Sequence, residues 1–253
     1  MSSIKVIKIG GKVIDDEQSR AKFLKDFASI SGPKILVHGG GNIASDIGNE
    51  MGLTPNFVDG RRITDAETLR LVTMVYGGLV NKSMVAQLQA LNVQALGLTG
   101  ADMNVIRSSK RTTDPIDFGF VGDVEEVNYP VLKTLLVQGI CPVVAPLTHD
   151  GAGQMLNTNA DTIAAEIAMA MVQKDNTVEL IYCFEQSGVL NEGKVIEKMN
   201  LLTFRHLKGI GVVSDGMVPK LDTGFRALRA GVHNVKIKSF KALTEEMGTE
   251  LVA

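Results

Sequence analysis

The feature that most constrains this chain is a run of three glycines, Gly39 to Gly41, between an apolar segment and a helical pattern. The apolar segment, 34–37, is typical of a buried strand, and apolar residues recur at helical spacing from Ile43 to Met51. Glycine has no Cβ, so its backbone N–H groups are open to a ligand, and the start of a helix attracts negative charge. The pattern predicts a loop that binds phosphate or carboxylate, although three glycines also suit a tight turn.

A second glycine loop follows the first apolar run of the chain, 4–9. Gly10 and Gly11 lie there between Lys8 and Lys12. Two glycine loops after two successive strands suggest one site that holds two anionic groups side by side. Lys8 ends the first strand, so we expect its ammonium group to point toward such an anion.

The order of apolar and amphipathic segments predicts an α/β fold. Strand-like runs alternate with helical patterns, which implies a mainly parallel sheet with right-handed crossovers. Two segments, 56–64 and 104–127, interrupt the alternation and are expected to form antiparallel excursions. The sequence Thr64-Asp65-Ala66-Glu67 fits a capping box, which predicts that a helix starts after Thr64.

Composition excludes several classes of protein. The net charge of −2 over 253 residues, with no tryptophan and 5% aromatic residues, argues against a nucleic-acid surface. No apolar run approaches the length of a membrane span. Cys141 and Cys183 lie in apolar strand-like runs, and the first strand begins by Ile4 without a signal peptide, so we expect a cytoplasmic protein. The four histidines lack metal-ligand spacing, and we expect no metal site built from side chains.

Two further charged residues lie beside predicted turns. Lys220 follows a glycine-rich stretch at the start of a helix, and Asp161 lies at another helix start. Two lysines converging on one site suit phosphoryl transfer, whose transition state spreads negative charge over the equatorial oxygens. Asp161 would hold both ammonium groups in place. Taken singly, each lysine also fits a solvated surface residue.

Together these segments resemble the amino acid kinase family, and within it the kinases that phosphorylate N-acylglutamates. The resemblance covers nearly the whole chain in the same order. It is carried by Lys8-Ile-Gly-Gly, His38-Gly-Gly-Gly-Asn, Asp59-Gly-Arg-Arg-Ile-Thr, Gly119-Phe-Val-Gly, Asn157-Thr-Asn-Ala-Asp161 and Asp215-Gly-Met-Val-Pro-Lys220.

The resemblance implies a three-layer αβα sandwich around a mainly parallel sheet, in two lobes. Residues 1–174 would bind the acyl amino acid and dimerise, and residues 175–253 would bind ATP with Mg²⁺. The implied reaction phosphorylates the side-chain carboxylate of a small-molecule substrate, an N-acylglutamate, in arginine biosynthesis. The carboxylate is already a nucleophile at neutral pH, so no general base is needed.

The resemblance also assigns roles to single residues. Lys8 and Lys220 would stabilise the transferring phosphoryl group, with Asp161 organising both lysines. Gly40 and Gly41 would present N–H groups to the reacting carboxylate, while Arg62 and Asn157 would hold the α-carboxylate. The residues expected around the nucleotide and its phosphates are Gly10, Gly11, Gly188, Gly216 and Met217.

The chain departs from the family pattern at two places. Phe184 and Glu185 stand where the family usually has a hydroxyl residue and an aspartate, which puts the nucleotide contacts in question. Arg61 stands where the family commonly has leucine. If Arg61 and Arg62 alternate along a strand, Arg61 faces away and is solvated. If the hairpin twists, Arg61 would meet an acidic acyl group such as succinyl.

Assembly and regulation are also expectations from the resemblance. In this family, arginine feedback goes with an additional N-terminal helix that links dimers into a hexamer. Only Met1 to Ser3 precede the first predicted strand. We therefore expect a homodimer that arginine does not inhibit, with the apolar helix from Leu69 to Val80 as its contact surface.

Three alternatives remain at this stage. The run Gly39–Ala44, with Asp59 about twenty residues on, also fits the dinucleotide fingerprint of a nicotinamide-dependent oxidoreductase. That reading leaves Lys8, Asp161 and Lys220 unexplained. Another amino acid kinase, acting on a different carboxylate, is a closer alternative. A regulatory protein without catalysis on the same fold is the third.

Overall fold

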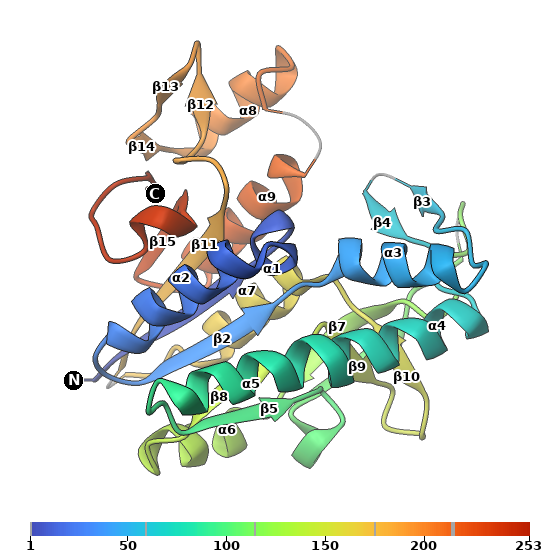
Figure 1. Ribbon diagram of the computed structural model, residues 1–253. Coiled ribbons are helices and arrows are strands. Elements are labelled where there is room, and N and C mark those ends of the chain that lie inside the picture. Colours follow the sequence, from blue (N-terminus) through green and yellow to red (C-terminus); the bar gives the residue numbers. More distant parts are fainter. Residues whose placement is uncertain (1, 59, 114, 175, 214–215) are drawn as a thin grey trace.

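The computed structural model describes residues 2–58, 60–113, 115–174, 176–213 and 216–253 (Figure 1). Its centre is an eight-stranded sheet in the order β14-β16-β15-β11-β1-β2-β8-β5. Every neighbouring pair is parallel except β15 and β16. The strands are β1 (Ser2–Ile9), β2 (Lys34–His38), β5 (Ala95–Leu98), β8 (Cys141–Val144), β11 (Asn176–Phe184), β14 (Lys198–Met199), β15 (Asn234–Ser239) and β16 (Thr249–Leu251).

Helices cover both faces of this sheet, so the predicted three-layer sandwich is confirmed. Side chains alternate along the central strands: Val6 enters one hydrophobic core and Ile7 enters the other. The first core is closed by α6 (Tyr129–Val137), α7 (Ala160–Ala170), α8 (Leu201–Gly209) and α9 (Met217–Arg229). The second is closed by α1 (Lys12–Asp15), α2 (Glu17–Ser29), α3 (Gly41–Glu50), α4 (Ala66–Val72), the π-helix η1 (Thr73–Val80) and α5 (Asn81–Ala90).

The two predicted excursions are antiparallel, but one is larger than expected. Segment 56–64 forms the hairpin of β3 (Phe57–Val58) and β4 (Arg61–Arg62). Segment 104–127 supplies β6 (Ile106–Lys110) and β7 (Gly122–Val127), which join β9 (Leu147–His149) and β10 (Met155–Asn157) in a four-stranded sheet. A further hairpin pairs β12 (Leu190–Asn191) with β13 (Lys194–Val195). Two short 3₁₀ helices, η2 (Asp102–Asn104) and η3 (Phe240–Ala242), complete the elements.

The predicted capping box is wrong by one residue. Asp65, not Thr64, caps α4, and its side chain accepts a hydrogen bond from the Thr68 N–H. Thr64 is buried and instead bridges to Gly119. The break expected at Gly77-Gly78 falls inside η1, so the chain runs from α4 through a π-helical stretch into α5.

The site is positioned by the carboxyl ends of three adjacent strands. Ile9 of β1 pairs with His38 of β2 on one side and with Cys183 of β11 on the other. The loops that follow these strands therefore lie in a row at one edge of the sheet. The pairing of β1 with β11 also carries the sheet across residue 174, where the two-lobe division was predicted; that division stays a prediction. No helix in the described part of the chain is long and apolar enough to cross a membrane.

Candidate active site

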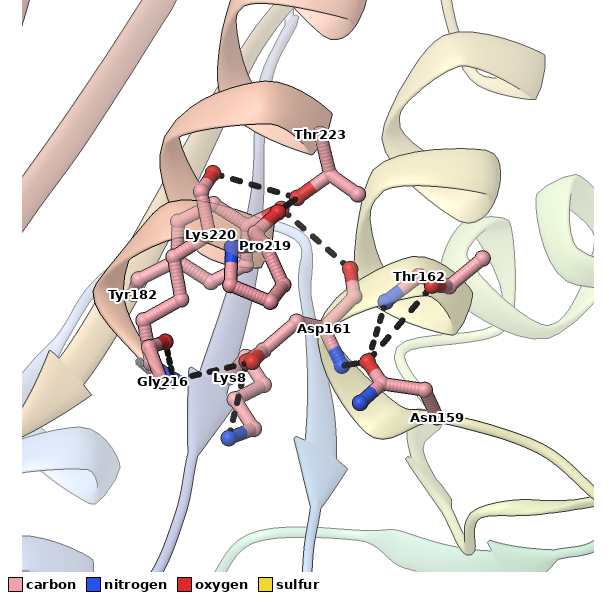
Figure 2. Close-up of polar contacts among 9 residues, drawn as sticks. All are labelled: Lys8, Asn159, Asp161, Thr162, Tyr182, Gly216, Pro219, Lys220 and Thr223. Atoms are coloured by element: carbon pink, nitrogen blue, oxygen red, sulfur yellow. Dashed lines mark hydrogen bonds and ion pairs between the residues drawn. The ribbon is translucent and has the colours of Figure 1, made fainter. Parts of the chain in front are cut away.

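Lys8, Asp161 and Lys220 meet at this edge (Figure 2). Lys8 Nζ lies 2.8 Å from Asp161 Oδ1, and Lys220 Nζ lies 3.0 Å from Asp161 Oδ2. The three side chains come from β1, α7 and α9, which are far apart in sequence. The structure thus brings together all three residues that the sequence selected for phosphoryl transfer.

Local structure explains why Asp161 takes this position. Asn159 caps α7, and its side-chain oxygen accepts hydrogen bonds from the Asp161 and Thr162 N–H groups at 2.9 and 3.1 Å. Asp161 is therefore in the first turn, where a negative charge is stabilised by the helix dipole. Lys220 lies in the first turn of α9 and also donates to the Gly216 carbonyl oxygen at 3.0 Å.

The charges in this cluster shift the pKa of two members. Burial alone would raise the pKa of Asp161, but the two lysines outweigh burial and hold that pKa at about 2. Burial also lowers the pKa of Lys8, with Asp161 opposing the shift and Lys220 adding to it. The side chains of Lys8 and Asp161 are only 9% and 7% exposed. Asp161 therefore stays ionised, and its charge makes a second buried cation tolerable.

The two glycine loops adjoin, as their positions in the sequence predicted. A Cβ placed on Gly39 would lie 3.7 Å from the Gly10 Cα. A Cβ on Gly10 would lie 2.2 Å from Lys8 Nζ, so the ammonium group occupies the space that a side chain would need. Gly40 has a φ of 145°, which favours glycine. Gly41 begins α3, and no atom lies within 4 Å of its missing side chain.

His38 fixes the orientation of the loop Gly39–Gly41 through hydrogen bonds. Its Nδ1 lies 2.7 Å from the Gly39 carbonyl oxygen, and its Nε2 lies 3.0 Å from Asn81 Nδ2. These contacts assign the proton to Nδ1, because Nε2 must accept from the amide. The peptide bond is planar and trans, so the Gly40 N–H points away from the carbonyl that His38 holds. His38 is fully buried, and burial lowers its pKa to about 4, so the ring is neutral near pH 7.

One cavity, of about 180 Å³, lies beside the longer glycine loop. Gly40, Gly41, Arg62 and Asn157 line it, and these are the four residues predicted to bind the substrate. The other lining residues are Gly39, Phe57, Gly60, Arg61, Tyr76, Arg111, Val121, Pro146, Thr158, Asn159 and Ala160. This set mixes the aromatic rings of Phe57 and Tyr76 with arginine and asparagine side chains, which suits a small substrate with a carboxylate.

Arg62 is held rigidly in that cavity. Its Nη2 donates to the Gly41 carbonyl oxygen at 2.8 Å and to Ser45 Oγ at 2.7 Å, and its guanidinium lies 4.6 Å from the Phe57 ring centroid. A guanidinium has five N–H donors, so these bonds leave donors for a ligand. Asn157 Nδ2 donates to Thr64 Oγ1 at 2.9 Å.

The lysine pair lines a second cavity. Lys8, Gly10, Gly11 and Lys220 line it, together with Asn42, Phe184, Glu185, Gln186, Gly216 and Met217. Four of the five residues predicted for the nucleotide are in this set. Gly188 is not in it: a Cβ there would lie 2.8 Å from Thr249 Oγ1, so the backbone packs closely against Thr249, and a nucleotide contact of Gly188 stays a prediction.

Sequence reasoning missed three polar residues around the site. Tyr76 and Arg111 line the first cavity, and Tyr182 lies behind the ion pairs. Arg111 follows a polar strand and looks like a surface residue in sequence, and the two tyrosines lie in apolar runs that predict core. Only the tertiary contacts show that these three residues lie at the site. Within the described residues no group of three or more His, Cys, Asp or Glu side chains is arranged to hold a metal ion.

Comparison with known proteins identifies the class to which this fold and site belong. The model described as "Amino acid kinase family" matches residues 3–239. A solved structure from Streptococcus mutans is similar with a TM-score of 0.84 and 29% identity, covering 100% of both chains. The chain therefore belongs to the amino acid kinase family.

Within that family, the chain is similar to proteins named acetylglutamate kinase. The one from Cytophaga hutchinsonii is 52% identical over 264 residues, covering 100% of each chain. The one from Bacteroides thetaiotaomicron is 53% identical over 250 residues, covering 97% of each.

Proposed function

We propose that this protein is an acetylglutamate kinase-like phosphotransferase, which uses ATP to phosphorylate the side-chain carboxylate of an N-acylglutamate in arginine biosynthesis. The observation that carries the proposal is the Lys8–Asp161–Lys220 cluster, in a chain that is 52% identical to an acetylglutamate kinase. The two lysines line the second cavity, and Asn159 and Ala160, next to Asp161 in the chain, line the first. One cavity offers residues for a carboxylate substrate, and the other offers residues for phosphates.

In this mechanism the residues position and neutralise charge. The substrate carboxylate forms a bond to the γ-phosphorus, and the bond from that phosphorus to ADP breaks, which gives an acyl phosphate. Lys8 and Lys220 stabilise the negative charge of the transferring group. Asp161 holds both lysines and contacts no substrate. Gly40 and Gly41 donate N–H groups to the reacting carboxylate, and Arg62 with Asn157 binds the α-carboxylate.

The second cavity fits a nucleotide phosphate chain. Gly10 and Gly11 put no side chain in the way, and Lys8 and Lys220 supply two positive charges. Glu185 is the one carboxylate among the described lining residues of this cavity. Mg²⁺ would neutralise phosphate charge when bound with ATP, and a single protein carboxylate suits the few protein ligands that Mg²⁺ usually takes.

Neither main alternative explains these contacts as well. A nicotinamide-dependent oxidoreductase would need Asp59, which lies outside the described residues, and would leave the two ion pairs without a role. A kinase for a substrate with a free amine would need an acidic group to meet that amine. The described residues that line the first cavity include arginines but no Asp or Glu.

The test is trapping of the acyl phosphate. The protein, N-acetylglutamate, MgATP and hydroxylamine should give a hydroxamate that depends on all three reactants. Calorimetry with MgATP and with NAD separates a kinase from an oxidoreductase. Binding of NAD without any hydroxamate would overturn the proposal, and MgATP binding without hydroxamate from any acylglutamate would favour a regulatory protein.

We also propose that the protein is a cytoplasmic homodimer. Met74 and Leu79, on the helix predicted to form the dimer contact, are 49% and 52% exposed. Burying these apolar side chains against a second copy would be favourable. Light scattering at the mass of a monomer would contradict the dimer.

A further inference from the structure

The hydroxyl of Tyr182 lies between the two helices that supply Asp161 and Lys220 (Figure 2). Tyr182 is fully buried on β11. Its Oη donates to the Asp161 carbonyl oxygen at 3.2 Å and lies 2.9 Å from Thr223 Oγ1. Thr223 is on α9, so these two contacts join α7 to α9 through one hydroxyl.

Thr223 extends the connection to the backbone of the second lysine. Its Oγ1 lies 2.8 Å from the Pro219 carbonyl oxygen and 3.1 Å from the Lys220 carbonyl oxygen. The hydroxyl pair therefore contacts the main chain of both Asp161 and Lys220, whose side chains form an ion pair of 3.0 Å.

The third member of the cluster is fixed to the same residue by the sheet. Lys8 is the direct partner of Tyr182 in the parallel ladder of β1 and β11. Tyr182 thus connects to Lys8 through strand pairing, to Asp161 through a hydrogen bond, and to Lys220 through Thr223. The sequence motifs of the site do not include Tyr182.

These contacts are rigid for physical reasons. A buried hydroxyl without a partner is costly, so the tyrosine and threonine oxygens keep these distances. A tyrosine has few rotatable bonds and its ring is packed in the core. Burial and the nearby Asp161 carboxylate raise the pKa of the Tyr182 hydroxyl, so it remains a neutral donor.

We propose that Tyr182 and Thr223 are positioning residues for the phosphoryl-transfer cluster, setting the distance between the Asp161 carboxylate and the Lys220 ammonium group. This inference rests on the proposed function for its kinetic consequence. Neither residue touches substrate, and both act through the backbone of residues that do the chemistry or organise it.

The test compares Tyr182→Phe and Thr223→Val with a matched control. Thr134→Val removes the same kind of hydroxyl contact, 2.9 Å from Thr134 Oγ1 to the Pro130 carbonyl oxygen, on α6. Displacing a catalytic group slows the chemical step, so we expect kcat to fall roughly tenfold or more in the two site variants. KM for N-acetylglutamate should change by less than about twofold, since ground-state contacts remain. Thr134→Val should keep the parent kcat.

Two further measurements separate positioning from general loss of structure. Thr223→Ser keeps the hydroxyl and should restore most of the parent kcat. Because the Tyr182 and Thr223 hydroxyls belong to one connected set of contacts between α7 and α9, losing either breaks the connection, and the double variant should lose little more activity than the worse single variant. A Tyr182→Phe variant with the parent kcat would overturn the proposal, and so would additive losses in the double variant.

A structural readout keeps this inference distinct from the proposed function. A crystal structure of Tyr182→Phe should show the Lys220 Nζ to Asp161 Oδ2 distance lengthened beyond 3.0 Å. An unchanged distance would overturn the positioning role even if the parent proves to be a kinase. A parent without kinase activity would overturn the proposed function, while the distance would still decide whether Tyr182 positions the ion pair.

Discussion

At the scale of single residues, the site depends on one carboxylate shared by two lysines. Asp161 has one oxygen directed to Lys8 and the other to Lys220. Without that charge the buried Lys8 ammonium group would lie unpaired beside the half-buried Lys220, and leaving a buried charge unpaired is strongly destabilising. Asp161 is therefore as necessary to the arrangement of this cluster as the lysines are.

This arrangement predicts a kinetic signature for the first lysine. Lys8→Arg keeps the positive charge but displaces it and spreads it over a planar guanidinium. The variant therefore loses the stabilisation of the transferring phosphoryl group that is made only in the transition state. We expect kcat to fall by roughly 100-fold or more with little change in KM. Lys5→Arg, on the same strand, is the control and should be neutral. Asp161→Ala should lose at least as much activity. A change in KM alone for Lys8→Arg would refute the catalytic role.

The acyl group is a second question at this scale. Arg61 is exposed and Arg62 is buried, as alternation along β4 predicts. Both nevertheless line the first cavity, and Arg111 lines it too. The Arg111 guanidinium is paired with Asp123, so Arg61 is the second arginine of this cavity that the acyl group could meet.

If Arg61 meets the acyl group, the enzyme should prefer N-succinylglutamate over N-acetylglutamate, because the succinyl carboxylate would pair with that guanidinium. In Arg61→Leu the ratio of the two kcat/KM values should fall by roughly two- to fivefold, as for an ion pair partly open to water. Steady-state kinetics of both substrates with the parent and the variant measures this. A parent that prefers the acetyl form, with an unchanged ratio in the variant, would show that Arg61 is only a solvated residue.

At the scale of elements, the glycine loops that follow β1 and β2 leave space that other groups of the site occupy, such as the Lys8 ammonium group beside Gly10. In Gly10→Ala the new methyl group would lie 2.2 Å from Lys8 Nζ, at the flexible end of that side chain. We expect the lysine to be displaced and kcat to fall by roughly 100-fold, while the protein still folds. Gly209→Ala, at the end of α8 with no atom within 4 Å, is the matched control. Unchanged kcat in Gly10→Ala would mean that Lys8 does not act from this position.

The same scale shows where sequence reasoning succeeds and where it stops. The glycine run Gly39–Gly41 and the helical spacing of Phe23, Leu24 and Phe27 are both local patterns. The loop predicted from the first and the helix predicted from the second are present in the structure. The motifs also led to Lys8, Asp161 and Lys220, which meet in the structure. The joining of β9 and β10 to β6 was missed because these strands have three residues each and pair over long separations.

Residues whose role is purely tertiary were also missed. Tyr182 lies in an apolar run and reads as core, which it is; only the Asp161 carbonyl and Thr223 hydroxyl beside it reveal a second role. Gly188 was selected by its place in a motif; the structure shows that its backbone packs closely against Thr249, and its contact with a nucleotide stays a prediction.

At the scale of the whole molecule, burying a titratable ring beneath the site makes stability depend on pH. His38 is fully buried, hydrogen bonded to Gly39 and Asn81, and close to the Lys82 cation. Burial lowers its pKa to about 4 from 6.5, with Lys82 adding to the shift and the Gly39 hydrogen bond opposing it. The folded protein therefore resists a proton that the unfolded chain accepts.

The sign of the effect follows from this difference. Above pH 6.5 the His38 ring is mostly neutral in both the folded and the unfolded state, so its protonation does not change the free energy of unfolding. As the pH falls toward 4, only the unfolded state binds the proton, so the free energy of unfolding decreases, by about 3 kcal/mol in total. Asp161 acts in a lower window, because its pKa of about 2 means that its stabilisation is lost only as the pH falls from about 4 to 2.

Urea unfolding between pH 7 and pH 4 measures this contribution. The parent should lose stability steadily over that range, and His38→Asn should lose about 3 kcal/mol less, since asparagine does not titrate there. The variant will be less stable at pH 7, so the slope against pH is the quantity compared. His206→Asn removes an exposed histidine from α8 and should keep the parent slope. If His38→Asn also kept the parent slope, the buried ring would not be the group that couples folding to protonation. That result would also contradict the assignment of a neutral His38 ring to the hydrogen bond with the Gly39 carbonyl.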